Sequence, residues 1–142
     1  MNAFHFTRGT TSLVRLTHGE DLLEELVAAC REARAQAGAL EVIGAVSSLA
    51  LGFYHQDRKE YETHTFEGTW EIASGVGNIS LLADEPFVHL HVVASGDDGL
   101  CVGGHVMPGC TVCAAEAAIT VLAGHPPPER ELDGVTGLKL WR

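Results

Sequence analysis

The chain has 142 residues, of which 46% are hydrophobic and 20% are charged, so one domain with one core is expected over residues 1–142. Nineteen Asp and Glu against nine Lys and Arg give a formal net charge of −10. That charge disfavours nucleic-acid binding, because phosphate contacts need clustered basic residues. The apolar runs are too short or too interrupted to span a bilayer, and the first residues lack a signal-peptide pattern. We therefore expect a cytoplasmic protein with no membrane contact.

A strand followed by an amphipathic helix is expected at the start of the chain. Residues 4–16 are read as the strand, and Thr17–Glu20 has the S/T-x-x-E form of a helix capping box. Gly38 marks the end of the helical pattern. The apolar residues at helical spacing are Leu22, Leu23, Leu26, Val27, Cys30, Ala33 and Ala37. Such a helix covers one face of a sheet.

The remaining segments read as strands. Residues 39–54 form a long apolar run, which predicts a buried strand bent at Gly44 or Gly52. Pro126–Pro128 ends the last long strand rigidly. Further strands are expected at residues 61–66, from residue 70, in 87–107, at 111–122 and at 137–141. The fold class is therefore α+β, a single domain with a largely antiparallel sheet of seven to eight strands and one main helix packed on it.

The segment Phe87–Met107 is predicted to form a β-hairpin around which the rest is organised. A three-residue loop, Asp97-Asp98-Gly99, with Gly99 in the left-handed conformation, is a common hairpin closure. That closure pairs Gly96 with Leu100 and sets His91 directly opposite His105. A four-residue loop would shift the register by one and turn His105 to the other face.

Three histidines share one face of this predicted hairpin. His89 and His91 are two residues apart on a strand, so they point to the same side. Cross-strand Cβ atoms lie about 5 Å apart, which lets His89, His91 and His105 converge on one metal ion at about 2.1 Å per bond. The alternative is that two surface histidines and a third by chance share a face.

Other candidate residues carry weaker signals. Glu116 is a carboxylate within the apolar run 111–122, which favours a structural hydrogen bond or a subunit contact over catalysis. Cys110 and Cys113 form one C-x-x-C, whose side chains point to opposite faces of a strand, so buried thiols are favoured over a zinc or redox site. Cys101 falls on the histidine face and is a minor candidate ligand.

Several segments together resemble the PPC domain, the "plants and prokaryotes conserved" domain. The resemblance covers essentially the whole chain, and the H-L-H and G-G-H motifs are its most specific part. The segments are GVGNIS (75–80), PFVHLHVV (86–93), DGLCVGGHV (98–106) and TGLKLW (136–141). The helix beginning at HGED (18–21) and the strand VIGAVSSLALGFY match in the same order.

The resemblance implies a compact α+β fold that assembles as a homotrimer. It also implies a metal site, commonly zinc, at His89, His91 and His105. Plant members of the family join the domain to an AT-hook and bind DNA. No Arg-Gly-Arg-Pro core occurs in this sequence, so the DNA-binding role is not carried over.

Two functional hypotheses follow, and a third is weaker. The first is a metal-binding oligomeric module with an assembly or regulatory role, and the second is a zinc enzyme that uses an open coordination position. Glu71, Asn78 and Glu116 are candidates to support the metal site or to transfer protons, and a small-molecule ligand is compatible with both hypotheses. A cupin-type enzyme is disfavoured, because no glutamate stands three or four residues after His91. DNA binding ranks last.

Overall fold

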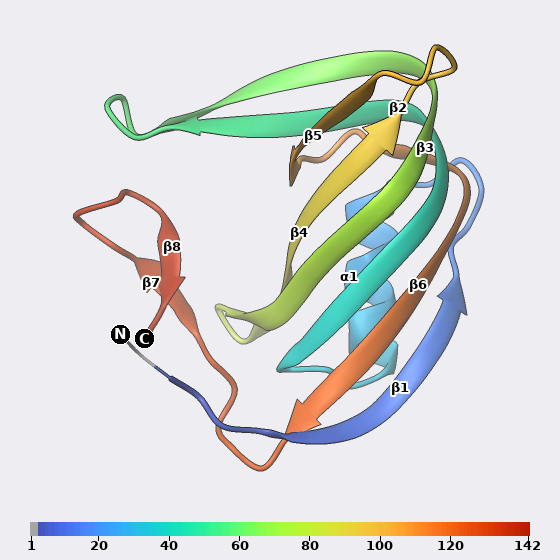
Figure 1. Ribbon diagram of the computed structural model, residues 1–142. Helices are drawn as coiled ribbons and strands as arrows, with labels where there is room; N and C mark the ends of the chain where they lie inside the picture. The colour runs from blue at the N-terminus through green and yellow to red at the C-terminus, as the bar shows by residue number, and fades with distance from the viewer. Residues whose placement is uncertain (1–2) are drawn as a thin grey trace.

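A curved six-stranded sheet carries one helix on one face and leads into a separate two-stranded sheet (Figure 1). The computed structural model describes residues 3–142. The elements are β1 (Thr7–Arg15), α1 (Leu22–Glu32), β2 (Gly38–His55), β3 (Glu60–Leu82), β4 (Glu85–Ser95), β5 (Cys101–Val106), β6 (Thr111–Ala123), β7 (Arg130–Leu132) and β8 (Lys139–Trp141). The α+β class with one helix and antiparallel strands is confirmed.

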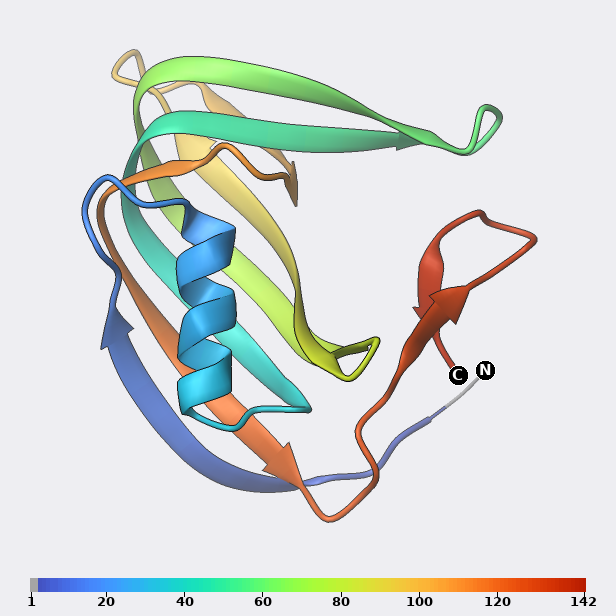
Figure 2. The same cartoon turned by 180° about the vertical axis from the view of Figure 1, so that it is seen from behind.

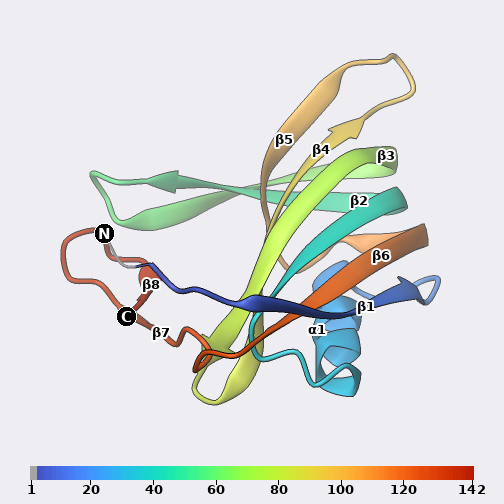
Figure 3. The ribbon, with the colours of Figure 1, turned by 60° about the horizontal axis from the view of Figure 1, so that its bottom comes forward.

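The large sheet has the strand order β1-β6-β2-β3-β4-β5, and all these neighbours are antiparallel. The last strand, β5, also pairs with β2, through Leu51 opposite Val106 and Gly52 opposite His105. Strands β2 to β5 therefore close on themselves at one end. Figure 3 shows the resulting curvature, with α1 and the β7–β8 hairpin on different sides of the sheet.

The β2–β3 hairpin is longer than the sequence predicted. The strands expected at 61–66 and from residue 70 are parts of one strand, β3. Where β2 pairs with β3, register shifts between Val42 and Gly44 and between Val46 and Ser48 bend the hairpin without ending it. Its outer part, residues 49–66, projects from the sheet, and we call it the arm (Figure 1).

Helix α1 begins and ends at residues other than those expected. Its N-cap is Asp21, whose carboxylate accepts hydrogen bonds from the backbone N–H groups of Leu23 and Glu24 at 2.9 and 3.1 Å. The predicted capping box at Thr17 is therefore wrong. The helix stops at Glu32 because Arg34 adopts a left-handed φ of 51°, so it does not reach Ala37.

Figure 2 shows α1 lying against one face of the sheet, and the core lies between the two. Leu22, Leu26 and Cys30 of α1 are fully buried. From the sheet, Leu40, Leu90 and Ile119 are buried in the same cluster. The opposite face, which we call the open face, has no helix over it.

The last two strands form a sheet of their own, so the prediction of seven to eight strands in a single sheet is wrong. Residues 126–128 are three prolines, which have no backbone N–H to offer to a β-ladder. The strand predicted at 137–141 is β8, and it pairs with β7 instead of the edge of the large sheet. Within residues 3–142, no helix is long and apolar enough to cross a membrane.

Candidate metal centre

The β4–β5 hairpin has the register that the sequence predicted. His91 lies opposite His105, and Ser95 lies opposite Cys101. The backbone N–H of Gly96 donates to the carbonyl of Leu100 at 2.9 Å, and Gly99 has a φ of 78°. The three-residue loop and its left-handed glycine are thus confirmed.

This register brings His89, His91 and His105 together on the open face. One nitrogen from each ring lies within 4.8 Å of the others, and the Nε2 atoms of His89 and His91 are 3.2 Å apart. Two ligands of a tetrahedral zinc ion at about 2.1 Å per bond are roughly 3.4 Å apart. The spacing of these two nitrogens therefore suits a shared metal ion.

The electrostatics of the cluster also suit a metal. Burial, and to a lesser extent the charges of Arg130 and His91, lowers the pKa of His89 to about 4. Burial, together with the neighbouring histidines and Arg130, lowers the pKa of His105 to about 4. Both rings are therefore neutral at pH 7, with lone pairs free for a metal. The Nδ1 atom of His105 is buried and has no hydrogen-bond partner among the described residues, so the donor set fits a zinc ion.

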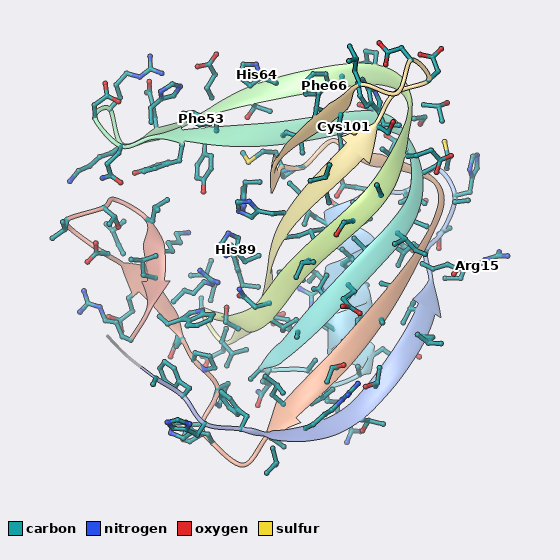
Figure 4. The ribbon with its side chains drawn as sticks, in the orientation of Figure 1. Arg15, Phe53, His64, Phe66, His89 and Cys101 are labelled. Carbon is teal, nitrogen blue, oxygen red and sulfur yellow. The ribbon has the colours of Figure 1, made fainter. Side chains whose placement is uncertain are left out.

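A pocket of about 280 Å³ lies beside the cluster, between the arm, β4 and the β7–β8 hairpin. Figure 4 shows the side chain of His89 pointing from β4 toward that hairpin. The pocket is lined by His89, His105, Phe87, Tyr54, Lys59, Glu60, Tyr61, Arg130, Gly137, Leu138, Lys139 and Leu140. The ring of Tyr61 stacks on that of His105, with centroids 5.1 Å apart.

Comparisons with known proteins agree with the fold and the cluster. A family model of the Plants and Prokaryotes Conserved (PCC) domain matches residues 4–123. The chain belongs to this family. PCC and PPC abbreviate the same family name, so the resemblance to the PPC domain is confirmed.

Three solved structures illustrate the similarity. A metal-containing protein from Archaeoglobus fulgidus is 38% identical, with a TM-score of 0.94 over 100% of this chain and 99% of that chain. A PPC protein from Pyrococcus horikoshii is 32% identical, with a TM-score of 0.92 over 100% and 97%. A supposed DNA-binding protein from Bacteroides thetaiotaomicron is 24% identical, with a TM-score of 0.85 over 96% of each chain, and shows the fold alone. The search of curated proteins gave no match.

The three residues expected to support the metal site lie in different places in this PPC fold. Asn78 lies opposite His89 on the neighbouring strand, and its Oδ1 accepts a hydrogen bond from Arg130 at 3.0 Å. Glu71 lies at the far end of β3, opposite Ser95. Glu116 is on β6, in a different pocket, beside Ile43 and Arg15. Only Asn78 lies next to the histidines.

The cysteines lie outside the histidine cluster. Cys110 is buried, and burial raises the pKa of its thiol to about 11. Its Sγ accepts a hydrogen bond from the backbone N–H of Ala50 at 3.2 Å. Cys101 is exposed and lies opposite Ser95, beside the hairpin loop. These positions give the cysteines no part in the site described here.

Sequence reasoning missed Arg130 and the arm tyrosines. Arg130 is only 7% exposed, yet it follows the prolines and precedes a polar stretch, which reads as an exposed turn. Tyr61 lies 28 residues before His89 in the chain. The only sequence signal for this side of the site was the TGLKLW motif, whose four central residues, 137–140, line the pocket.

Proposed function

We propose that this PPC protein holds one zinc ion between His89, His91 and His105 and acts as a metal-binding oligomeric module in assembly or regulation. The observation that carries the proposal is the convergence of three ring nitrogens within 4.8 Å on the open face. Two of the rings are neutral at pH 7 because burial lowers their pKa values to about 4. The metal-containing relative from Archaeoglobus fulgidus supports it further.

Zinc is the metal we favour for this donor set. Neutral imidazole nitrogens suit zinc, and three of them leave one coordination position for another ligand. Copper, nickel and iron also bind imidazole, so these are the metals from which a measurement must distinguish zinc. The pocket beside His89 and His105 gives a fourth ligand room to enter.

Metal content tests the proposal directly. We expect elemental mass spectrometry of untagged protein, purified without chelators, to find about one zinc per chain in the wild type and none in His91→Ala. His18→Ala is the matched control, because His18 instead bonds to the carbonyl of Cys113 and should keep the metal. Zinc retained by His91→Ala, or another metal at full occupancy in the wild type, would refute the zinc site.

The oligomer is proposed to be a homotrimer that uses the open face. Leu13, Ile43 and Val76 on β1, β2 and β3 are 86%, 57% and 60% exposed, and apolar patches of this kind mark interaction surfaces. Light scattering should give three times the chain mass of 15.1 kDa, and Ile43→Glu should give monomers. A monomeric wild type would contradict the trimer.

A zinc enzyme is the second candidate, and the pocket favours it. A zinc ion with an open position supplies Lewis-acid chemistry when bound. Around it, this chain offers the hydroxyl of Tyr61, the carboxylate of Glu60 and the ammonium of Lys59. The cobalt-substituted protein tests for the open position: added azide should change its visible spectrum. An unchanged spectrum would indicate a closed site and favour the non-catalytic module.

A further inference from the structure

We infer that the pocket beside the three histidines binds a small carboxylate, which pairs with the guanidinium of Arg130 and reaches toward the metal. The inference deepens the proposed function and rests on it for the metal. The contact between the carboxylate and Arg130, however, does not require the metal. The two parts can therefore fail separately.

Arg130 is a buried cation held by neutral groups. Its Nε donates to Ser80 Oγ at 2.7 Å, and its two terminal nitrogens donate to the Lys139 carbonyl at 2.9 Å and to Asn78 Oδ1 at 3.0 Å. These bonds dock the β7–β8 hairpin onto β3. They use three of the five N–H groups of a guanidinium and leave two for another acceptor.

The positive charge of Arg130 has no counter-ion in the described part of the chain. No carboxylate of residues 3–142 forms an ion pair with it. The acid that lines the same pocket, Glu60, pairs with Arg58 at 3.1 Å. A buried charge without a partner is unfavourable, because it loses its hydration and gains no opposite charge in return. The lowered pKa of Arg130, which burial causes, reflects the same cost.

The pocket is also unusually positive for an acidic protein. Of the nine Lys and Arg in a chain of net charge −10, Arg130, Lys59 and Lys139 line it, with one acid. The Nζ of Lys59 donates to the Gly134 carbonyl at 2.8 Å, and no carboxylate within residues 3–142 forms an ion pair with it. A divalent metal held by neutral histidines would add two further positive charges beside Arg130. An anion is the ligand that this charge distribution favours.

The shape of the pocket selects a small, planar anion. The guanidinium carbon of Arg130 lies 4.8 Å from the ring centre of Phe87 and 5.5 Å from that of Trp141. The rings lie against the guanidinium, so its two unused N–H groups are the contact left for an acceptor, and a carboxylate is the anion whose two oxygens match a guanidinium. The volume of about 280 Å³ and the side chains of Leu138 and Leu140 suit a short apolar body.

Isobutyrate is a suitable probe, and isobutyramide is its uncharged control of the same shape. We would titrate each into the zinc-loaded, isotopically labelled protein and follow backbone NMR signals of the β7–β8 hairpin. We expect saturable binding of isobutyrate and at least ten-fold weaker binding of the amide. Equal binding of the two, or no saturable binding of isobutyrate, would overturn the inference.

Two variants distinguish the cation from its structural role. Arg130→Gln keeps donors for docking the hairpin but removes the charge, and it should weaken isobutyrate binding at least ten-fold. Leu140→Trp keeps Arg130 and fills the pocket, with the same expected loss. Leu132→Trp places the same bulk on the exposed side of β7, outside the pocket, and should bind normally. Unchanged binding in Leu140→Trp would overturn the inference even if Arg130→Gln does not fold.

The metal-free variant His91→Ala separates this inference from the proposed function. His91 does not line the pocket, so Arg130 stays in place, and isobutyrate should still bind there, more weakly than in the zinc-loaded wild type. If the wild type holds zinc but does not bind isobutyrate, the inference fails and the metal site stands. If no zinc binds but isobutyrate still binds through Arg130, the metal site fails and the carboxylate site stands.

Discussion

The two faces of strand β4 carry alternating residues, and one face packs in the core while the other carries the histidines. Val88, Leu90, Val92 and Ala94 point toward α1 and are buried in the core. His89 and His91, between them, point to the open face. A single strand thus supplies both stability and chemistry, and neighbouring residues should respond differently to mutation.

Leu90→Ala should give the largest loss of stability. Leu90 is 0% exposed, and removing a buried leucine side chain costs about 3 kcal/mol, through lost burial and the cavity left behind. Urea denaturation measures this loss. The folded variant should still hold one zinc per chain, because its histidines point to the other face. A loss of zinc with little loss of stability would contradict the division of β4 into a core face and a metal-binding face.

Acid should be the next largest perturbation of the metal-free protein. The folded pKa of His89 and His105 is about 4, below the value of 6.5 for a free histidine, so the unfolded chain binds more protons between these values. Stability is therefore full above pH 6.5 and falls as the pH drops toward 4. After allowance for partial exposure, we expect a loss of about 2 kcal/mol between pH 7 and 5.

Urea denaturation of chelator-treated protein at several pH values measures this slope. His89→Gln is the matched control, because it removes one of the two titrating rings and should reduce the slope by about half. A slope that is the same in His89→Gln and the wild type would show that other groups are responsible.

Inserting one glycine after Asp98 should have a smaller effect, about 1 kcal/mol, because a four-residue loop is also a common closure. The sequence alone predicts that a four-residue loop turns His105 to the other face, but the metal should stay, because β5 is held by β2 as well as by β4. A slip in register would expose Val106, which is buried. Accommodating a longer loop costs less free energy than that exposure. Zinc content and urea denaturation check both points. Loss of zinc would show that the loop alone sets the register.

His91→Ala should have the smallest effect on the fold. His91 is exposed, and substitutions at exposed positions usually change stability by less than about 0.5 kcal/mol. Thermal denaturation of the metal-free protein should therefore match the wild type. Added zinc should stabilise the wild type and leave His91→Ala unchanged. A large loss of stability in the metal-free variant would mean that His91 belongs to the core.

Local patterns predicted one side of the site well. The alternation in β4 and the turn residues at 97–99 fixed which histidines share a face, and the structure confirms their pairing. Long strands such as β2 and β6 also followed from their apolar runs. These features depend on neighbours in the chain, so periodicity and turn chemistry suffice to find them.

The other side of the site depends on contacts between distant segments. Arg130 reaches Ser80 and Asn78 some 50 residues away, and Tyr61 reaches His105 across the closed end of the sheet. Nothing in the local sequence predicts that the polar stretch after the prolines folds back onto β3. The sequence also could not predict that residues 60–82 form one bent strand, because a glycine such as Gly68 signals a turn as readily as a bend within a strand.

Anomalous diffraction at the zinc edge, from crystals of the zinc-loaded protein, tests the central claim most directly. The account predicts one strong peak per chain, about 2.1 Å from a ring nitrogen of each of His89, His91 and His105. A peak at the cysteines or at Glu116, or a zinc ion that contacts only one of the three rings, would contradict it.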